Sequence, residues 1–347
     1  MPFKCEFCGS DKFSIDLDSR TIFCAEESCG VSFTMDDLLK MVEEHDAAEN
    51  DWKNPQEPAY SQTMDSDSER FEIEGTILKR YRGFQADVFV RNGITEIGNA
   101  FKNLDYVKRV SLPPGLKKIG SDAFSACTAL TSVSLPDSVE EIGEYAFYGC
   151  KSLKYIEIPE SVTRIQDFAF GGCSSLEYVV IPEGVQSIGD FAFEDCISLE
   201  YVEIPETVTY IGDSAFESCE ELEQVEIPEA VTYIGRAAFK GCADLKKVEM
   251  TEGVTYIGEA AFENCVSLKG IIIPDSVEEI GELAFKNCVS LEEKKVEYPS
   301  RFPAGTWEDS SIYKTQYEKS LNQGICPGCN KRLSFFGRIC RNCGERY

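Results

Sequence analysis

The stretch Cys196-Ile-Ser-Leu-Glu-Tyr-Val-Glu-Ile-Pro-Glu-Thr-Val-Thr-Tyr-Ile-Gly-Asp-Ser-Ala-Phe-Glu-Ser-Cys219 decides the fold of this chain. It runs from cysteine to cysteine, and its pattern recurs on both sides at a step of 23 residues. The shared unit is Cys-x-x-Leu-x-x-Val-x-Ile-Pro-x-x-Val-x-x-Ile-Gly-x-x-Ala-Phe. Self-similarity at one fixed period indicates a repeat architecture.

The period is carried by columns of identical residues. The phenylalanine column contains Phe101, Phe124, Phe147, Phe170, Phe193, Phe216, Phe239, Phe262 and Phe285. The cysteine column contains Cys127, Cys150, Cys173, Cys196, Cys219, Cys242, Cys265 and Cys288. Exceptions are few: Thr251 stands where most units have proline, and Gln166 replaces a glycine.

Each unit predicts two short strands and a turn. The Val-x-Ile alternation has a period of two, which favours a strand with one buried face, and the proline that follows ends it. Val-x-x-Ile-Gly predicts a second extended segment, and Ala-Phe-x-x-Cys predicts one helical turn with Phe and Cys inward. One unit cannot bury its own apolar face, so the units must stack.

This unit resembles the BspA-like leucine-rich repeat family, including its Treponema-type repeats. The resemblance extends over about residues 71–299, and Asp87–Gly98 matches the family's strand-and-turn pattern at the start. It implies an α/β repeat solenoid, curved and right-handed, with a parallel β-sheet on the concave face. We expect about nine units in residues 71–300.

The repeat cysteines have two interpretations. One is a redox or metal ladder, and the other is an apolar core column. Stacked equivalent positions place Cβ atoms about 4.8 Å apart, whereas a disulfide needs about 3.8 Å and converging geometry. Leu104 fills the same slot in the first unit, which favours the core column.

The other eight cysteines predict two structural zinc ions, because paired Cys turns present two sulfurs to one ion. Each site would have four thiolate ligands: Cys5, Cys8, Cys24 and Cys29 in one, and Cys326, Cys329, Cys340 and Cys343 in the other. The alternative is a pair of disulfide-bonded hairpins in a secreted protein. The order of the first set, with a hairpin between the pairs and a helix after them, is similar to the zinc ribbon of bacterial primases.

These patterns predict five segments. They are an N-terminal zinc ribbon with an amphipathic helix (1–48), an acidic linker (49–70), the solenoid (71–300), a linker with a short helix (301–323) and a C-terminal zinc ribbon (324–347). No apolar run is long enough to span a membrane, and no signal peptide is visible after Met1. We therefore expect a cytoplasmic location.

Composition argues against most enzymes. The 347 residues carry a formal charge of −27 and one histidine, His45, so chemistry that depends on several histidines is excluded. Phosphate-binding loops and the nucleophile elbow are missing from the sequence. The negative charge also repels nucleic acid.

A candidate partner surface follows from the first strand of each unit, where residues flanking the inward Val and Ile are expected to face outward on the concave side of the solenoid. The proposed partner-binding residues are Tyr155, Tyr178, Tyr201, Glu157, Glu203, Glu226 and Glu249. Exposed aromatic clusters favour interaction sites, although Tyr and Glu also pack well as plain ladder residues. A second column, Tyr210, Tyr233 and Tyr256, is interpreted as structural stacking.

The sequence thus favours a non-enzymatic protein-binding scaffold with zinc modules at its ends. One alternative is a nucleic-acid-associated regulator, for which the C-terminal ribbon supplies a local basic cluster. That cluster contains Lys331, Arg332, Arg338, Arg341 and Arg346. Another alternative is a surface adhesin, which requires export and oxidised cysteines.

Overall fold

The computed structural model describes residues 13–16, 21–24, 32–34, 67–292 and 296–297. The chain forms two compact units, Met1–Asp65 and Ser66–Tyr347. In the first unit, β1 (Phe13–Asp16), β2 (Thr21–Cys24) and β3 (Ser32–Thr34) form an antiparallel sheet in the order β1-β2-β3. The hairpin of β1 and β2 sets Phe13 opposite Cys24, which agrees with the hairpin expected between the two cysteine pairs.

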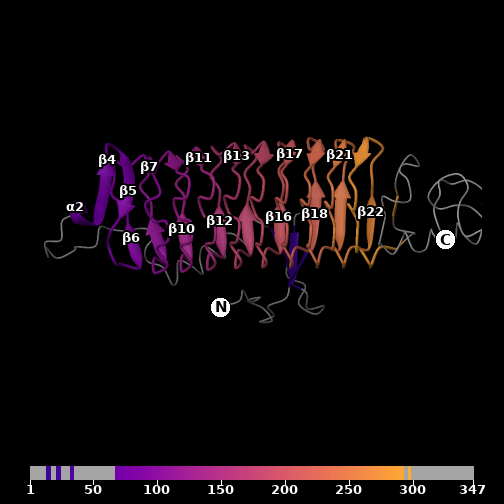
Figure 1. The fold of residues 1–347 in the computed structure, drawn as a ribbon, viewed down its shortest axis with the longest axis horizontal. Helices are drawn as coiled ribbons and strands as arrows, with labels where there is room; N and C mark the ends of the chain where they lie inside the picture. Colours follow the sequence, from indigo (N-terminus) through magenta and orange to yellow (C-terminus); the bar gives the residue numbers. More distant parts are fainter. Residues whose placement is uncertain (1–12, 17–20, 25–31, 35–66, 293–295, 298–347) are drawn as a thin grey trace, which may run out of the picture. The chain divides into compact units, whose positions relative to one another are not determined.

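The second unit is a stack of coils with two strands in each (Figure 1). The first strands form one set of parallel ladders: β6 (Asp87–Phe89), β8 (Arg109–Ser111), β10 (Ser132–Ser134), β12 (Tyr155–Glu157), β14 (Tyr178–Val180), β16 (Tyr201–Glu203), β18 (Gln224–Ile227), β20 (Lys247–Met250), β22 (Gly270–Ile272) and β24 (Val296–Glu297). We call this set the first ladder.

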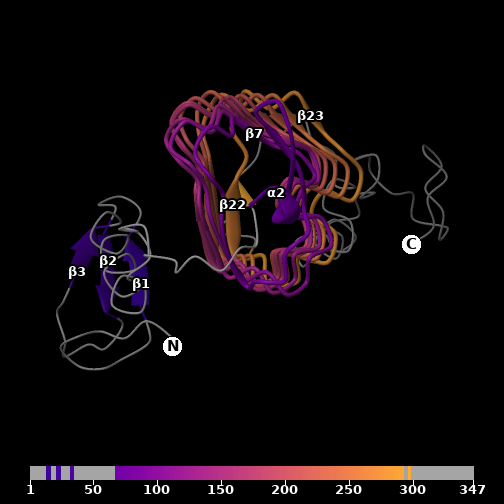
Figure 2. The ribbon, with the colours of Figure 1, turned by 90° about the vertical axis from the view of Figure 1, so that its left-hand side faces the viewer.

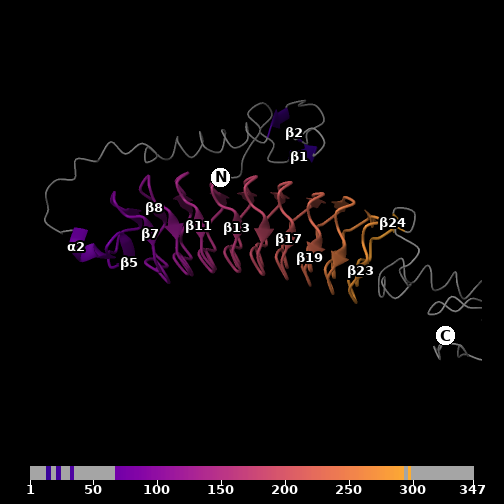
Figure 3. The same cartoon turned by 90° about the horizontal axis from the view of Figure 1, so that it is seen from above.

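The second strands form the second ladder: β7 (Glu96–Ile97), β9 (Lys118–Ile119), β11 (Glu141–Ile142), β13 (Arg164–Ile165), β15 (Ser187–Ile188), β17 (Tyr210–Ile211), β19 (Tyr233–Ile234), β21 (Tyr256–Ile257) and β23 (Glu279–Ile280). Figure 2 looks along the stack and places β22 and β23 on different sides of the coil. Seen from above in Figure 3, the coils follow one another in sequence order from β5 to β24.

Strand pairing keeps the 23-residue period through the middle of the array, whereas Asp87 pairs with Arg109 one residue short of it and Ile271 pairs with Val296 two residues beyond it. Tyr155 pairs with Tyr178, and Tyr178 pairs with Tyr201, in parallel register. On the second ladder Ile211 pairs with Ile234 in the same way. Equivalent residues of consecutive units therefore lie side by side, as the repeat predicts.

An antiparallel hairpin covers the start of the second ladder. The helix α2 (Asp67–Arg70) leads into β4 (Phe71–Glu74), which pairs with β5 (Ile77–Tyr81), and β5 then pairs with β7 in parallel. Phe71 and Tyr81 are buried, with ring centroids 5.3 Å apart. An edge strand that is closed by a short hairpin offers fewer free backbone groups to a second chain.

The predicted α/β class is wrong, as the segment between each second-ladder strand and the next first-ladder strand shows. Within the described ranges the only helix is α2, and the segment expected as a helical turn is a pair of consecutive tight turns. Tyr148 N–H donates to the Tyr145 carbonyl three residues back, while Phe147 N–H donates to the Ala169 carbonyl of the next coil. A helix directs its N–H groups along its own axis, so it cannot supply these sideways bonds between coils.

The core is built from the predicted columns. All nine phenylalanines of the column are fully buried, and neighbouring rings stack with centroids 5.1–5.5 Å apart. The eight repeat cysteines are free and buried, which confirms the core interpretation. Each thiol donates to a core carbonyl, as Cys127 Sγ does to Phe101 O at 2.9 Å. Burial raises the pKa of Cys127 to about 12.

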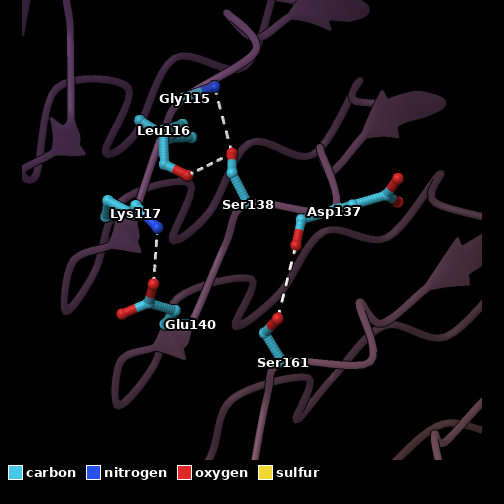
Figure 4. Close-up of polar contacts among 7 residues, drawn as sticks. All are labelled: Gly115, Leu116, Lys117, Asp137, Ser138, Glu140 and Ser161. Carbon is cyan, nitrogen blue, oxygen red and sulfur yellow. Dashed lines mark hydrogen bonds and ion pairs between the residues drawn. The ribbon is translucent and has the colours of Figure 1, made fainter.

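Side chains add contacts between coils. In Figure 4, Ser138 Oγ donates to the Leu116 carbonyl at 2.7 Å and accepts from Gly115 N–H at 3.0 Å. Lys117 Nζ lies 2.5 Å from Glu140 Oε1, one repeat further along the chain. Exposed ion pairs such as Lys117–Glu140 each contribute little to the free energy of unfolding. The buried core columns therefore carry most of the stability.

Candidate binding surface

The structure brings the predicted tyrosines into one row. Tyr155, Tyr178 and Tyr201 are the first residues of β12, β14 and β16, and direct register joins each to the next. All three side chains are half-buried, while the intervening Ile156 and Val179 point into the core. The row is therefore an outward surface on a rigid sheet.

The predicted glutamates form a parallel row on the same strands and their neighbours. Val180 lies between Glu157 and Glu203 in register, and Glu226 pairs with Glu249 on β18 and β20. Strand β16 lies next to β18, so the row continues across both sheets. Lys247 Nζ contacts Glu249 Oε1 at 2.6 Å, which places one cation within the acidic row.

Tyr178 forms a hydrogen bond to a third row, which consists of the charged residues directly before the first-ladder strands: Lys154, Glu177 and Glu200. Its hydroxyl donates to Glu200 Oε2 at 3.2 Å, and burial, reinforced by Glu200, raises the pKa of Tyr178. Burial also raises the pKa of Glu200. In the same row Lys154 Nζ contacts Glu177 Oε1 at 2.7 Å. The surface thus combines neutral phenols with carboxylates, a mixture that can bind both apolar and basic groups.

The second tyrosine column is a stack, as the sequence predicts. Ring centroids of Tyr210 and Tyr233 lie 5.0 Å apart, and those of Tyr233 and Tyr256 lie 4.8 Å apart, with nearly parallel planes. Burial and then the Asp190 carboxylate raise the pKa of Tyr210 to about 12. Asp190 also accepts the Asp213 N–H at 2.9 Å, which fixes its carboxylate between coils.

Most of the predicted zinc ligands lie outside the described residues. Cys24 ends β2, where only its backbone is described, and Cys5, Cys8, Cys29, Cys326, Cys329, Cys340 and Cys343 fall outside the ranges given above. The predicted helices after Cys29 and before Cys326 also lie outside these ranges. Within the described residues, no cluster of three or more His, Cys, Asp or Glu side chains is arranged to hold a metal ion.

Comparison with known sequences decides the family. A profile described as "BspA type Leucine rich repeat region" matches residues 95–223 and 164–292, in six copies, and these ranges span more than half of the chain. The chain belongs to the BspA-type leucine-rich repeat family. None of the curated proteins matches it significantly.

Several solved structures are similar to this BspA-type chain. The Treponema pallidum leucine-rich repeat protein is 28% identical, with 59% of this chain and 91% of that chain covered and a TM-score of 0.43. A leucine-rich cell surface protein from Faecalibacterium prausnitzii is 25% identical, with coverages of 70% and 90% and a TM-score of 0.34. A leucine-rich repeat protein from Eubacterium ventriosum is 21% identical, with coverages of 77% and 92% and a TM-score of 0.42.

The described part of this BspA-type chain contains no helix with the length and apolar character needed to cross a lipid bilayer.

The sequence analysis did not predict one feature of the surface, a group of aromatic side chains on the turn side of three consecutive coils. These residues are Tyr145, Tyr148, Phe168 and Phe191. The signal was present in the column two places before the core phenylalanine, which holds Tyr145, Phe168 and Phe191 in succession.

Proposed function

We propose that this protein is a non-enzymatic scaffold that binds a protein partner on the first ladder. The observation that supports the proposal is the registered tyrosine row of Tyr155, Tyr178 and Tyr201 beside the glutamate row. Aromatic side chains on a rigid support contribute contact area with little loss of conformational entropy on binding. Membership of a repeat family whose coils form extended surfaces supports binding rather than catalysis.

The partner chemistry follows from the rows. Glu157, Glu203, Glu226 and Glu249 favour a partner with basic residues, and the tyrosines favour apolar or aromatic groups between them. The negative charge of the whole chain, −27, steers such a partner toward the surface.

The repeat itself supplies a matched test variant. Ser132 occupies the position of Tyr155 in the preceding coil, so the triple change Tyr155→Ser, Tyr178→Ser and Tyr201→Ser introduces a residue that the coil already accepts. The control changes Tyr210, Tyr233 and Tyr256 to serine, because Ser187 occupies that column on the second ladder. Both triples remove three phenols.

The experiment is affinity capture from extracts of the native host, followed by direct titration of the purified partner. We expect the first-ladder triple to lose the partner, with binding at least about tenfold weaker, while the second-ladder triple retains it. Equal binding by all three proteins would show that the partner uses another surface.

We also propose that the terminal cysteines bind two structural zinc ions and that the protein is cytoplasmic. The β1–β2 hairpin between the cysteine pairs supports the N-terminal site. The free repeat thiols support a reducing compartment. Adhesion at the cell surface is the second candidate, and the similar cell surface protein of Faecalibacterium prausnitzii favours it. Oxidised terminal cysteines in protein from the native host would favour adhesion.

A further inference from the structure

The turn side of the solenoid carries an aromatic plate formed by Tyr145, Tyr148, Phe168 and Phe191. Tyr145, Phe168 and Phe191 stack in a row, with centroid separations of 4.6 and 4.5 Å and nearly parallel planes. Tyr148 stands edge-on to this row, 5.7 Å from Tyr145 and 6.3 Å from Phe168. Tyr148 is 40% exposed and the other three are half-buried, so the plate faces solvent over three coils.

The backbone beneath the plate disfavours these residues. Tyr145, Phe168 and Phe191 have φ values of 56°, 58° and 57°, in the left-handed region where bulky side chains are least tolerated. The fold needs no aromatic residue there, because Ser214 and Ala237 hold the next two positions of the column with the same backbone conformation. Three consecutive aromatics at this position therefore point to a role other than folding.

A glycine allows the fourth ring to complete the plate. A Cβ atom on Gly171 would lie 3.1 Å from Tyr148 Cδ2, so the Tyr148 ring lies across Gly171 in the next coil. Glu194 follows Gly171 in the same column, one coil further on. The column thus presents an exposed ring, then a position without a side chain, then a carboxylate.

The charge beside the plate is uncompensated within the described residues. Lys240 Nζ pairs with Glu217 Oε1 at 2.8 Å, whereas no described basic side chain lies within ion-pair distance of Glu194. Partial burial, with Asp195 and Glu217 nearby, raises the pKa of Glu194. A cation placed between Tyr148 and Glu194 would offset the repulsion between the Glu194 carboxylate and the carboxylates of Asp195 and Glu217.

We infer that the aromatic plate is a second docking surface, which binds an arginine-bearing segment of a partner protein. A guanidinium group stacks on an aromatic face and pairs with a carboxylate. The faces inside the row of Tyr145, Phe168 and Phe191 cover one another, so the exposed ring of Tyr148, which stands across the row, offers the aromatic face and Glu194 offers the carboxylate. A second copy of this chain fits poorly, because each copy carries a charge of −27. This surface lies on the turns, so the inference does not depend on the first-ladder proposal.

The test uses a defined probe with the full-length protein. A fluorescein-labelled peptide of alternating arginine and phenylalanine separated by glycine is titrated by fluorescence anisotropy, beside a peptide with glutamine for arginine. The plate variant is Tyr148→Ser with Phe191→Ser, since Ser125 and Ser214 hold the same positions in other coils. Tyr233→Ser on the second ladder is the control, and circular dichroism checks that every variant is folded.

We expect the arginine peptide to bind the plate variant about tenfold more weakly than the wild type and the control. Glu194→Gln should weaken binding about threefold at low salt and have less effect at about 0.5 M salt. Absent binding, equal binding to all variants, or equal binding of the glutamine peptide would each overturn the inference. Self-association that is lost in the plate variant, without peptide binding, would assign the plate to a second copy and would also overturn it.

Discussion

Removing one ring from the phenylalanine column should destabilise the solenoid far more than removing an exposed ring. Phe193 is fully buried between Phe170 and Phe216, with both centroids 5.3 Å away. Phe→Ala in a core typically costs about 3–5 kcal/mol, and each aromatic pair adds about 0.5–1.5 kcal/mol beyond burial. Because the substitution removes two stacked ring contacts as well as the buried ring, we expect Phe193→Ala to lower the free energy of unfolding by at least about 4 kcal/mol.

The assay is urea unfolding followed by circular dichroism, with Phe89→Ala as the control. Phe89 is 46% exposed on β6, so its removal should change stability by less than about 0.5 kcal/mol. A loss below about 2 kcal/mol for Phe193→Ala, or one no larger than that of the control, would refute the claim that the column carries the stability.

Hydrogen exchange adds a spatial test of the same substitution. Each coil of a solenoid contacts only its neighbours, so the loss should be greatest next to the cavity. We expect amide exchange to accelerate most in the coils that contain Phe170 and Phe216. Uniform acceleration from β6 to β22 would show that the array unfolds as one unit and that the local argument is wrong.

Three further predictions concern thiols, zinc and an ion pair. Iodoacetamide at about pH 8 should leave all eight repeat cysteines unmodified in the folded protein and alkylate all eight after denaturation, because the folded core buries every one of these side chains away from the reagent. Rapid reaction of the folded protein would contradict the core assignment. Native mass spectrometry should find two zinc ions per chain, and Cys326→Ser with Cys340→Ser should leave one, whereas an unchanged metal count would refute the C-terminal site. Arg109 donates to both oxygens of Asp87 and lowers the pKa of that carboxylate, so the pair stabilises the fold above the unfolded pKa of about 3.9 and loses this effect as pH falls through the lower folded pKa. Because the pair is exposed, Asp87→Asn should cost less than about 1 kcal/mol at neutral pH, and a difference from wild type that persists in strong acid would contradict the assignment.

The repeat period was enough to predict the stack and its core. Identical residues at one step had to become neighbours, so the rows of Tyr155, Tyr178 and Tyr201 and of the core phenylalanines followed from the sequence alone. The class was wrong because Phe147 and Cys150 have the spacing of a helical turn, while alternate N–H groups of that segment, such as that of Phe147, donate to the next coil and break the helical pattern. A local pattern cannot show which neighbour accepts a bond.

The aromatic plate escaped prediction for a different reason. Its column holds Asp122, Tyr145, Phe168, Phe191 and Ser214 in succession, so it lacks the constancy that made other columns visible. The left-handed backbone that makes aromatic residues unusual there is a property of the turn, which the sequence does not reveal. The zinc sites stay predictions, because they rest on cysteine spacing.

The constant register between coils has a consequence for how such a protein changes over generations. Every coil presents nearly the same pair of interfaces to its neighbours, so a duplication or deletion of one whole repeat in the gene re-forms an interface that already exists. A change of another length keeps the ladders in register only where a turn between strands absorbs it, as between Ile271 and Val296, which pair although they lie 25 positions apart instead of 23. The number of repeats can therefore change during evolution without loss of the fold. The aromatic plate spans three adjacent coils, so it is kept only where no repeat is inserted between Tyr145 and Phe191.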